Sequence, residues 1–288
     1  MPRKEVAILS KWEKLRHILT AEGKIDRPFH SMMEVFGPFA SAGVAPVEQR
    51  GEIALTALAQ VPHLLRALAQ HGQPAAASPW RPLESFADTE EKKAAAQRLE
   101  RMLQQHGSDK ANAKHGYHHF YGPLLAAQPI ERLLEIGIGT TNPAIASRMS
   151  AGNKYRPGAS LRAWRDFLPS AEIHGADIDR DILFQEERIS THYVDQTDAD
   201  SWQALARALP PHLDMVIDDG LHAIHTQLAS LLFGLEQLRP GGWVVIEDII
   251  LSAQPIWDVV AHLLAPHGRC HRLQGHHLLF AVQKHPPS

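Results

Sequence analysis

The sequence has very little cysteine, no long apolar run and almost no excess of charge. Cys270 is the only cysteine among 288 residues, which excludes an intramolecular disulfide and a metal cluster built from cysteines. No stretch of roughly 18 apolar residues occurs, and charges interrupt the first segment, so neither a membrane span nor a secretory signal is expected. The formal net charge of -3 argues against attraction of the whole surface to nucleic acid or anionic membrane. We therefore expect a cytoplasmic protein without a nucleic-acid or membrane partner.

The composition is that of a globular protein with one large domain and an additional segment. Hydrophobic residues make up 44% of the chain and charged residues 21%, enough for a sizeable core. The Ala-, Pro- and Ser-rich stretch at 72–82 is typical of a linker. We predict a helical N-terminal extension over residues 1–80 and a main domain over residues 81–288. The run from 52 to 72 has helical spacing, and Pro62 is expected to end or kink that helix.

From Ile130 onward, short apolar runs alternate with amphipathic segments, which predicts a parallel sheet with helices on both faces. A helix over 88–107, marked by an acidic start and a terminal glycine, precedes this region. The final stretch, 270–284, predicts two antiparallel strands joined around Gly275. The apolar runs are RLLEIGIG (132–139), EIHGADI (172–178), ISTHYVD (189–195), LDMVIDDG (213–220) and GGWVVIEDI (241–249).

Acids and glycines follow each apolar run, at the edge where open α/β sheets bind ligands. Gly137 and Gly139 lie in the first strand-to-helix turn, where the backbone must pass close to a ligand. Glu135, just before them, suits a ligand with a cationic amino group better than a pyrophosphate. Asp177 can accept both hydroxyls of a ribose, with Asp179 as the alternative. The other strand ends carry Asp195, Asp218, Asp219, Glu247 and Asp248.

A carboxylate cluster is expected where two of these strands end side by side. Asp219, Glu247 and Asp248 would bring three hard oxygen ligands to one point, which suits Mg²⁺ with retained waters. His222 follows closely and can take a proton, because the unperturbed pKa of histidine is about 6.5. His225, one turn further on, is a competing base. The spacing of the other histidines lacks a second cluster for zinc, so most are expected at the surface, including His115, His118, His119, His276 and His277.

The order of these motifs resembles that of class I S-adenosylmethionine-dependent methyltransferases. LLEIGIG, IHGADI, LDMVIDDG and LRPGGWVVIED carry the resemblance between about residues 130 and 284. A narrower resemblance is to the metal-dependent TylF-like sugar O-methyltransferases of the macrocin and mycinamicin type. It covers about residues 107–285 and rests on GSDKANAKHGYHHFY (107–121), PGASLRAWRDFLPSAEIHGADID (157–179), RISTHYVDQTD (188–198) and IDDGLH (217–222). The implied fold is a class I methyltransferase Rossmann-like sheet, mostly parallel with an antiparallel last strand.

The resemblance implies methyl transfer from S-adenosylmethionine to a hydroxyl with the help of Mg²⁺, the acceptor being a sugar on a glycosylated natural product. It assigns Asp219, Glu247 and Asp248 to the metal and His222 to the general base. A homo-oligomer is also implied. Asp218 would support the site or contact the cofactor. Asp109, Lys110 and Tyr117 would lie at the entrance of the active site, as contacts to cofactor or substrate. The implied cofactor residues are Glu135, Gly137, Gly139, Asp177, Asp195, Gln196, Asp218, Lys110 and Tyr117.

Three other functions stay open at this point. Metal chelation by adjacent oxygens would equally serve a methyltransferase acting on a catechol-like small molecule. An NAD-dependent oxidoreductase would use the same kind of sheet, but Glu135 and the absence of a third glycine at Asn142 disfavour it. A non-catalytic cofactor-binding partner is disfavoured by the retained acids. Residues 146–159 form an additional loop that could cover the ligand, followed by a helix that Ser160 is expected to cap.

Overall fold

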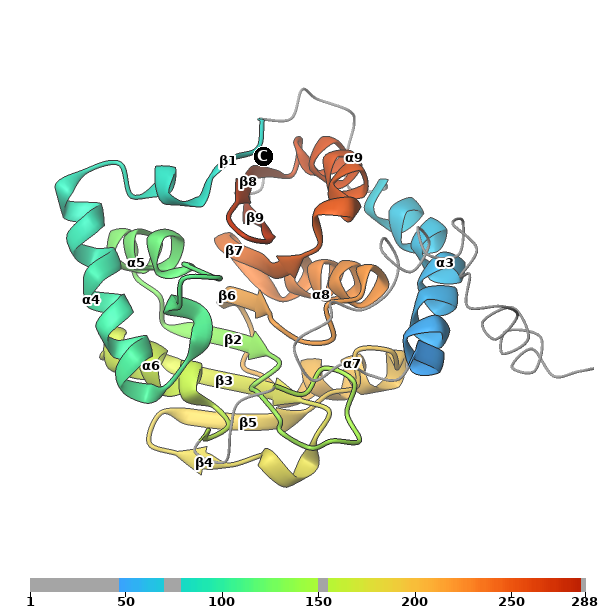
Figure 1. Ribbon diagram of the computed structural model, residues 1–288, viewed down its shortest axis with the longest axis horizontal. Helices are drawn as coiled ribbons and strands as arrows, with labels where there is room; N and C mark the ends of the chain where they lie inside the picture. Colours follow the sequence, from blue (N-terminus) through green and yellow to red (C-terminus); the bar gives the residue numbers. More distant parts are fainter. Residues whose placement is uncertain (1–46, 70–78, 150–154, 286–288) are drawn as a thin grey trace, which may run out of the picture.

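The computed structural model describes residues 47–69, 79–149 and 155–285, and these ranges form one nine-stranded sheet with helices packed against it (Figure 1). The sheet order is β1-β8-β9-β7-β6-β2-β3-β5-β4. The strands are β1 (Arg81–Pro82), β2 (Arg132–Ile136), β3 (Glu172–Asp177), β4 (Gln185–Glu186), β5 (Ile189–Tyr193), β6 (Leu213–Asp218), β7 (Leu238–Ile249), β8 (Gly268–Gln274) and β9 (Leu278–Lys284).

The predicted strand directions are confirmed. β2 is parallel to both β3 and β6, β3 is parallel to β5, and β6 is parallel to β7. β9 runs antiparallel to β7 and β8, so the last two long strands complete the sheet as expected. The two-residue strands β1 and β4 extend it at its two edges. All five strand ends that carry the predicted site residues therefore meet at one edge of the sheet.

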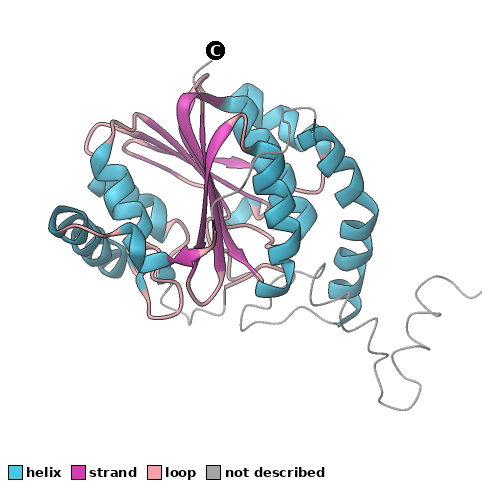
Figure 2. Cartoon of the chain, turned by 90° about the horizontal axis from the view of Figure 1, so that it is seen from above, coloured by secondary structure: helices cyan, strands magenta, loops and turns pink. Residues whose placement is uncertain are grey.

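Helices cover both faces of the sheet, as Figure 2 shows. The two faces arise from alternation along each strand: Leu133 packs with one cluster and Leu134 with the other, and Met215 and Val216 divide in the same way. α4, α5 and α6 contribute to the first cluster, and α7, α8 and α9 to the second. The helices are α3 (Val47–Ala69), α4 (Glu90–His106), α5 (His118–Ala127), α6 (Ala159–Phe167), α7 (Ala199–Ala208), α8 (Ile224–Gln237) and α9 (Gln254–Leu264), with short 3₁₀ helices η1 (Leu83–Phe86), η2 (Asp109–Ala111), η3 (Arg180–Ile182) and η4 (Leu251–Ala253).

α3, the described part of the predicted N-terminal extension, packs against α8 and α9. Pro62 was expected to end or kink this helix; it does not end it, because the helix continues to Ala69, and the kink stays a prediction. Proline in a helix interior forfeits one backbone hydrogen bond, but burial of Ala57, Val61 and Leu68 in the core of the main domain holds the helix together. Residues 1–46 and 70–78, with most of the predicted linker, lie outside the described ranges, so the division at residue 80 stays a prediction.

The ends of α4 and α6 test the expected helix signals. α4 has the predicted start and stop: Thr89 accepts a hydrogen bond from the Lys92 backbone N–H, and Gly107 is left-handed with φ 78°. The expected cap at Ser160 was wrong. Gly158 is the N-cap of α6, and the Ser160 hydroxyl donates instead to Glu135 at 2.8 Å. A buried carboxylate without hydrogen-bond donors is costly, so the Ser160 hydroxyl is more useful at Glu135 than as a helix cap.

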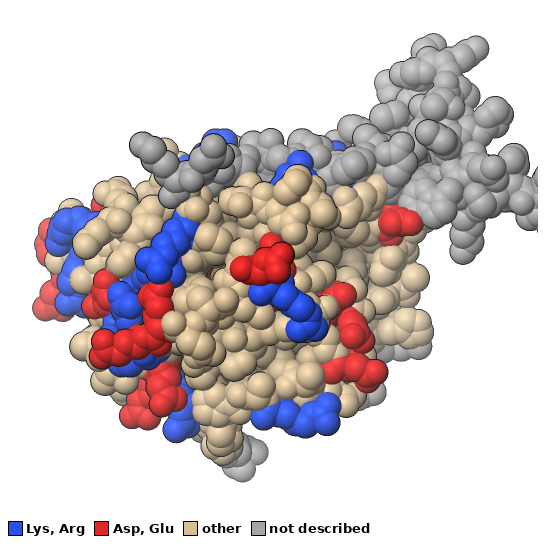
Figure 3. All heavy atoms as spheres, turned by 90° about the horizontal axis from the view of Figure 1, so that it is seen from below, with Lys and Arg blue, Asp and Glu red and all other residues tan. Residues whose placement is uncertain are grey.

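Charged side chains of both signs are interspersed on the face drawn in Figure 3, without one continuous basic area among its coloured residues. Among the described residues, none of the helices is long and apolar enough to span a membrane.

Candidate active site

Two adjoining cavities open where the carboxyl ends of the central strands meet. The first, of about 230 Å³, is here named the apolar pocket, and the second, of about 560 Å³, the acidic pocket. Both are bordered by Gly137, Ser147, Asp177 and Gly220, so they form two halves of one site. The site thus lies where ligands of open α/β sheets bind.

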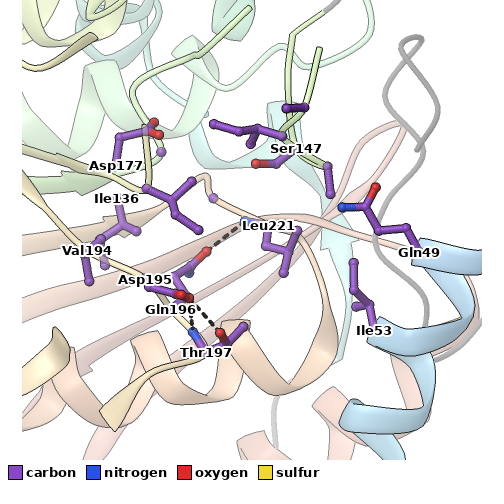
Figure 4. Close-up of a pocket in the computed structure, with 16 residues that line it drawn as sticks. Gln49, Ile53, Ile136, Ser147, Asp177, Val194, Asp195, Gln196, Thr197 and Leu221 are labelled. Carbon is purple, nitrogen blue, oxygen red and sulfur yellow. Dashed lines mark hydrogen bonds between the residues drawn. The ribbon is translucent and has the colours of Figure 1, made fainter. Parts of the chain in front are cut away.

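The apolar pocket is walled by aliphatic side chains at or just beyond the ends of β2, β3, β5 and β6, namely Ile136, Ile178, Val194 and Leu221. Figure 4 shows Gln49 and Ile53 of α3 on the opposite side of the pocket. The extension therefore contributes directly to the site. Flat apolar groups such as a purine ring suit such walls.

Gly137 borders both pockets and Gly139 lines the acidic pocket, with φ of 85° and 86°. A Cβ at Gly137 would lie 2.0 Å from the carbonyl oxygen of Asp219, and one at Gly139 would lie 2.2 Å from the hydroxyl of Tyr155. Both positions therefore need glycine for conformation and for space. Ser147, Met149 and Tyr155 line the acidic pocket, so the described parts of the 146–159 loop border the site; residues 150–154 lie outside the described ranges.

Asp177 lines both pockets, whereas Asp179 lines neither of the two. The Asp177 carboxylate accepts the backbone N–H groups of Ile138 and Asp179, both at 2.9 Å. Burial raises the pKa of Asp177, opposed by these hydrogen bonds. Asp179 instead accepts a hydrogen bond from the Thr140 hydroxyl at 2.5 Å and is the N-cap of η3. The geometry thus favours Asp177 as the side chain that meets a ligand.

Gln196 connects the end of β5 to the turn after β6. Its amide donates to Asp218 at 2.8 Å, and its carbonyl accepts the Leu221 backbone N–H at 2.8 Å. Asp195 lines the same pocket and accepts the Thr197 N–H and hydroxyl. Asp218 lies behind the pocket, 1% exposed, and burial raises its pKa to about 7. Gln196 and Asp218 therefore shape the wall of the site.

Lys110 is the central charge of the acidic pocket. Its ammonium lies 2.6 Å from Asp219, 2.6 Å from Glu247 and 3.2 Å from Glu135. Burial alone would lower the pKa of Lys110, but these carboxylates outweigh it and raise that pKa well above its usual value. Glu135 is fully buried and also accepts a hydrogen bond from the Trp164 indole N–H at 2.5 Å. The sequence suggested that Glu135 faces the amino group of a ligand, but in the structure it faces the ammonium of Lys110.

A β-bulge explains why the neighbours Glu247 and Asp248 point to different partners. The pairing of β7 with β9 shifts between Ile246 and Ile249, and Asp248 has φ 50°. Tyr121 donates to Glu247 and Tyr117 to Asp248, each at 2.5 Å. The two tyrosines are one helical turn apart at the start of α5, so one helix face serves both carboxylates.

His222 lies between two carboxylates at the pocket wall. Its Nε2 is 3.7 Å from Asp219 and 3.9 Å from Asp248. Its φ of 54° is strained for a residue with a side chain, and such strain costs on the order of 1–3 kcal/mol. His225, the competing base, is 1% exposed within α8, and burial lowers its pKa to about 4. The geometry thus favours His222 as the histidine that meets a ligand.

Comparisons with known proteins relate part of the chain to methyltransferases. Residues 134–249 match the model of a family described as a methyltransferase domain. The chain carries a methyltransferase domain. A segment of 129 residues is 38% identical to mycinamicin VI 2''-O-methyltransferase of Micromonospora griseorubida, covering 43% of this chain and 28% of that protein. A segment of 156 residues is 34% identical to a tetracenomycin rhamnosyl 3'-O-methyltransferase of Streptomyces olivaceus, covering 52% of this chain and 36% of that one.

The chain spans well under half the length of these curated relatives. Among solved structures, the MycE methyltransferase of the mycinamycin pathway, in complex with Mg and SAH, is 25% identical, with a TM-score of 0.50. The match covers 66% of this chain and 55% of that one. The predicted methyltransferase fold is confirmed.

The methyltransferase domain offers a divalent cation two of the three predicted ligands directly. Asp219 and Asp248 line the acidic pocket, and with His222 each provides a ligand atom within 4.8 Å of the others. Glu247 is 1% exposed, and its two carboxylate oxygens face Lys110 and Tyr121. Repulsion between Asp219 and Asp248 adds to burial in raising the pKa of Asp219. A cation therefore fits at this pair, whereas Glu247 would first have to release Lys110.

Sequence reasoning missed several residues of the methyltransferase domain's site. Tyr121 was not singled out, although its spacing from Tyr117 would have placed both on one helix face. Gln49 and Ile53 gave no signal, because nothing local relates α3 to the distant strand ends. His115 and His277 were expected at the surface, but both line the acidic pocket.

Proposed function

We propose that this chain transfers a methyl group from S-adenosylmethionine to a hydroxyl of a glycosylated natural product, with Mg²⁺ at the acidic pocket. The observation that carries the proposal is the two-part site of a methyltransferase domain, in which an apolar pocket adjoins a pocket holding His222 between Asp219 and Asp248. The first half suits a nucleoside, and the second suits a cation and a hydroxyl acceptor.

The residues around the apolar pocket fit S-adenosylmethionine, which when bound supplies the electrophilic methyl group. Gly137 lines this pocket with its backbone alone, so no side chain stands between a ligand and the end of β2 at that point. Asp177 accepts two backbone N–H groups, and its remaining lone pairs can accept the hydroxyls of a ribose. Asp195 and Gln196 border the pocket where the adenine would lie.

Asp219 and Asp248 would hold Mg²⁺, which lowers the pKa of a nearby hydroxyl and so eases its attack on a methyl group. Glu247, the third predicted ligand, would bind the metal only if its carboxylate first broke its ion pair with Lys110. Lys110 otherwise holds Asp219 and Glu247 in place and offsets part of their charge. The chain's own role at this point is to position acids around a cation.

His222 would take the proton of the acceptor hydroxyl. Its two flanking carboxylates stabilise the imidazolium that forms, and the strained backbone fixes where the ring lies. Apart from this proton transfer, the chain acts by holding the two reactants in line.

A sugar acceptor is favoured by the relative from Streptomyces olivaceus, whose name is that of an O-methyltransferase of a rhamnosyl tetracenomycin. A catechol-like acceptor is the second candidate, since adjacent hydroxyls could approach the same Asp219–Asp248 pair. An NAD-dependent oxidoreductase is disfavoured by the match to a methyltransferase family. A non-catalytic partner would bind the cofactor without turnover.

The test uses the full chain with methyl-labelled S-adenosylmethionine, Mg²⁺ and matched acceptors: macrolide and polyketide glycosides, their aglycones and simple catechols. We expect label on the glycosides and not on the aglycones, with loss of transfer in EDTA and in Asp219→Asn. Label on catechols alone would replace the sugar with the second candidate. Cofactor binding without transfer to any acceptor, with an unchanged result in Asp219→Asn, would leave only the non-catalytic function.

A further inference from the structure

Three side chains from separate segments meet at the rim of the acidic pocket. His115 lies in the loop between η2 and α5, Asp248 in the bulge of β7, and His277 in the turn between β8 and β9. Each offers one ligand atom, and these atoms lie within 4.8 Å of one another. The two histidine rings are 6.3 Å apart between centroids. All three residues line the pocket, so a small ion can reach the point between them.

The donor set differs from that of the Asp219–Asp248 pair. Two imidazoles and one carboxylate suit Zn²⁺, Co²⁺, Ni²⁺, Mn²⁺ or Fe²⁺, whereas Mg²⁺ prefers oxygen ligands alone. Three protein ligands also leave at least one position open, as in metal sites that bind a further ligand. Asp248 belongs to both groups, because the other group combines it with Asp219 and His222.

Neighbouring groups are arranged to orient these ligands. The Asp109 carboxylate lies 3.6 Å from Nδ1 of His115, an electrostatic contact longer than a hydrogen bond. The His115 ring also stacks on Tyr117, with centroids 5.5 Å apart and 12° between the planes. The Tyr117 hydroxyl in turn donates to Asp248 at 2.5 Å. Outer contacts of this kind accompany functional metal sites.

We propose that His115, Asp248 and His277 form a second metal site, which binds Zn²⁺ or a similar divalent ion in preference to Mg²⁺. This site shares Asp248 with the proposed Mg²⁺ site. The site stands on these three residues alone and does not depend on methyl transfer. Occupancy of the second site would engage Asp248 and so change the affinity of the first, because one carboxylate serves both.

The test is titration of the untagged full chain with Co²⁺ as a spectroscopic probe, in the presence of excess Mg²⁺. We expect a visible absorption band from imidazole-coordinated Co²⁺ with one equivalent bound, displaced by Zn²⁺. His115→Ala and His277→Ala should each weaken Co²⁺ binding by roughly tenfold or more. Asp219→Asn, which removes a ligand of the other site only, should keep the band.

His276→Ala is the matched control, since His276 is the adjacent histidine in the same turn and belongs to neither group. Its Co²⁺ affinity should stay within about threefold of the unmutated protein. Thermal unfolding of every variant without metal confirms that each is folded. No band in the unmutated protein, an unchanged band in either His115→Ala or His277→Ala, or loss of the band in Asp219→Asn would overturn the proposal.

Discussion

The two halves of the site are built on opposite principles. The apolar pocket is walled mainly by aliphatic side chains, and its polar residues Asp177, Asp195 and Gln196 bond to nearby backbone and side chains. The acidic pocket is built on buried and partly buried charges that are satisfied only together. Lys110 binds Glu135, Asp219 and Glu247, and tyrosine hydroxyls donate to Glu247 and Asp248. Single changes in the apolar pocket should therefore have graded effects, whereas changes in the acidic pocket should have large and non-additive ones.

The largest effect is expected at His222. His222→Ala should lower kcat by about 10²–10⁴, the usual contribution of a positioned general base, and leave the affinity for S-adenosylhomocysteine nearly unchanged. Single-turnover methyl transfer and calorimetry measure the two quantities. Because His222 borders the acidic half only, a parallel loss of cofactor affinity would break the division between the two pockets.

Removing the central charge should cost mainly stability. Lys110→Met leaves the buried carboxylates of Glu135 and Glu247 and the partly buried one of Asp219 without their cation, which should lower the free energy of unfolding by about 3–5 kcal/mol at neutral pH. The loss should shrink as the pH falls and the carboxylates become protonated. Urea unfolding measures it, and Lys110→Met/Glu247→Gln should recover part of the loss. Full additivity of the two changes would contradict the network.

Asp218 offers a pH-dependent test of the wall between the pockets. Its folded pKa of about 7 lies above the unfolded value of 3.8, so its contribution to stability is complete at low pH and is lost as the pH rises toward 7. Asp218→Asn cannot ionise, so between pH 4 and 7.5 it should gain about 2–4 kcal/mol relative to the unmutated protein. Urea unfolding in EDTA at several pH values measures the difference. Parallel pH profiles would show that the carboxyl is not perturbed.

The smallest effect is expected where α3 meets the apolar pocket. Ile53→Ser should weaken S-adenosylhomocysteine binding by roughly tenfold, because it removes apolar surface from one wall only. Leu58→Ser, on an exposed position of the same helix, is the matched control and should leave the affinity unchanged. Equal affinities for both variants would exclude α3 from the cofactor site.

Much of the fold could be predicted because its signals are local. The alternation of Leu133 and Leu134 between the two faces, the acidic start of α4 and its terminal Gly107 are all readable within a few residues. Pro62 does not end α3, because tertiary packing of that helix outweighs a local helix-breaking tendency. Local rules cannot measure that packing.

The site could be predicted only as far as strand ends reveal it. Asp219, Asp248, Asp177 and the two glycines border the site because parallel strands end at one edge. The partner of Glu135 and Glu247 could not be predicted, since Lys110 is 137 positions away from Glu247 and carries no pairing signal. The grouping of His115 with His277 was missed for the same reason.

Calorimetric titration of the full chain with S-adenosylhomocysteine, with and without Mg²⁺, tests the central claim most directly, with Asp177→Ala and Asp219→Asn compared in parallel. The account predicts tight nucleoside binding that is lost in Asp177→Ala and kept in Asp219→Asn, and Mg²⁺ binding that is lost in Asp219→Asn only. If S-adenosylhomocysteine does not bind, or if Asp177→Ala binds it as tightly as the unmutated chain, the division of the site into a cofactor half and a metal half is contradicted.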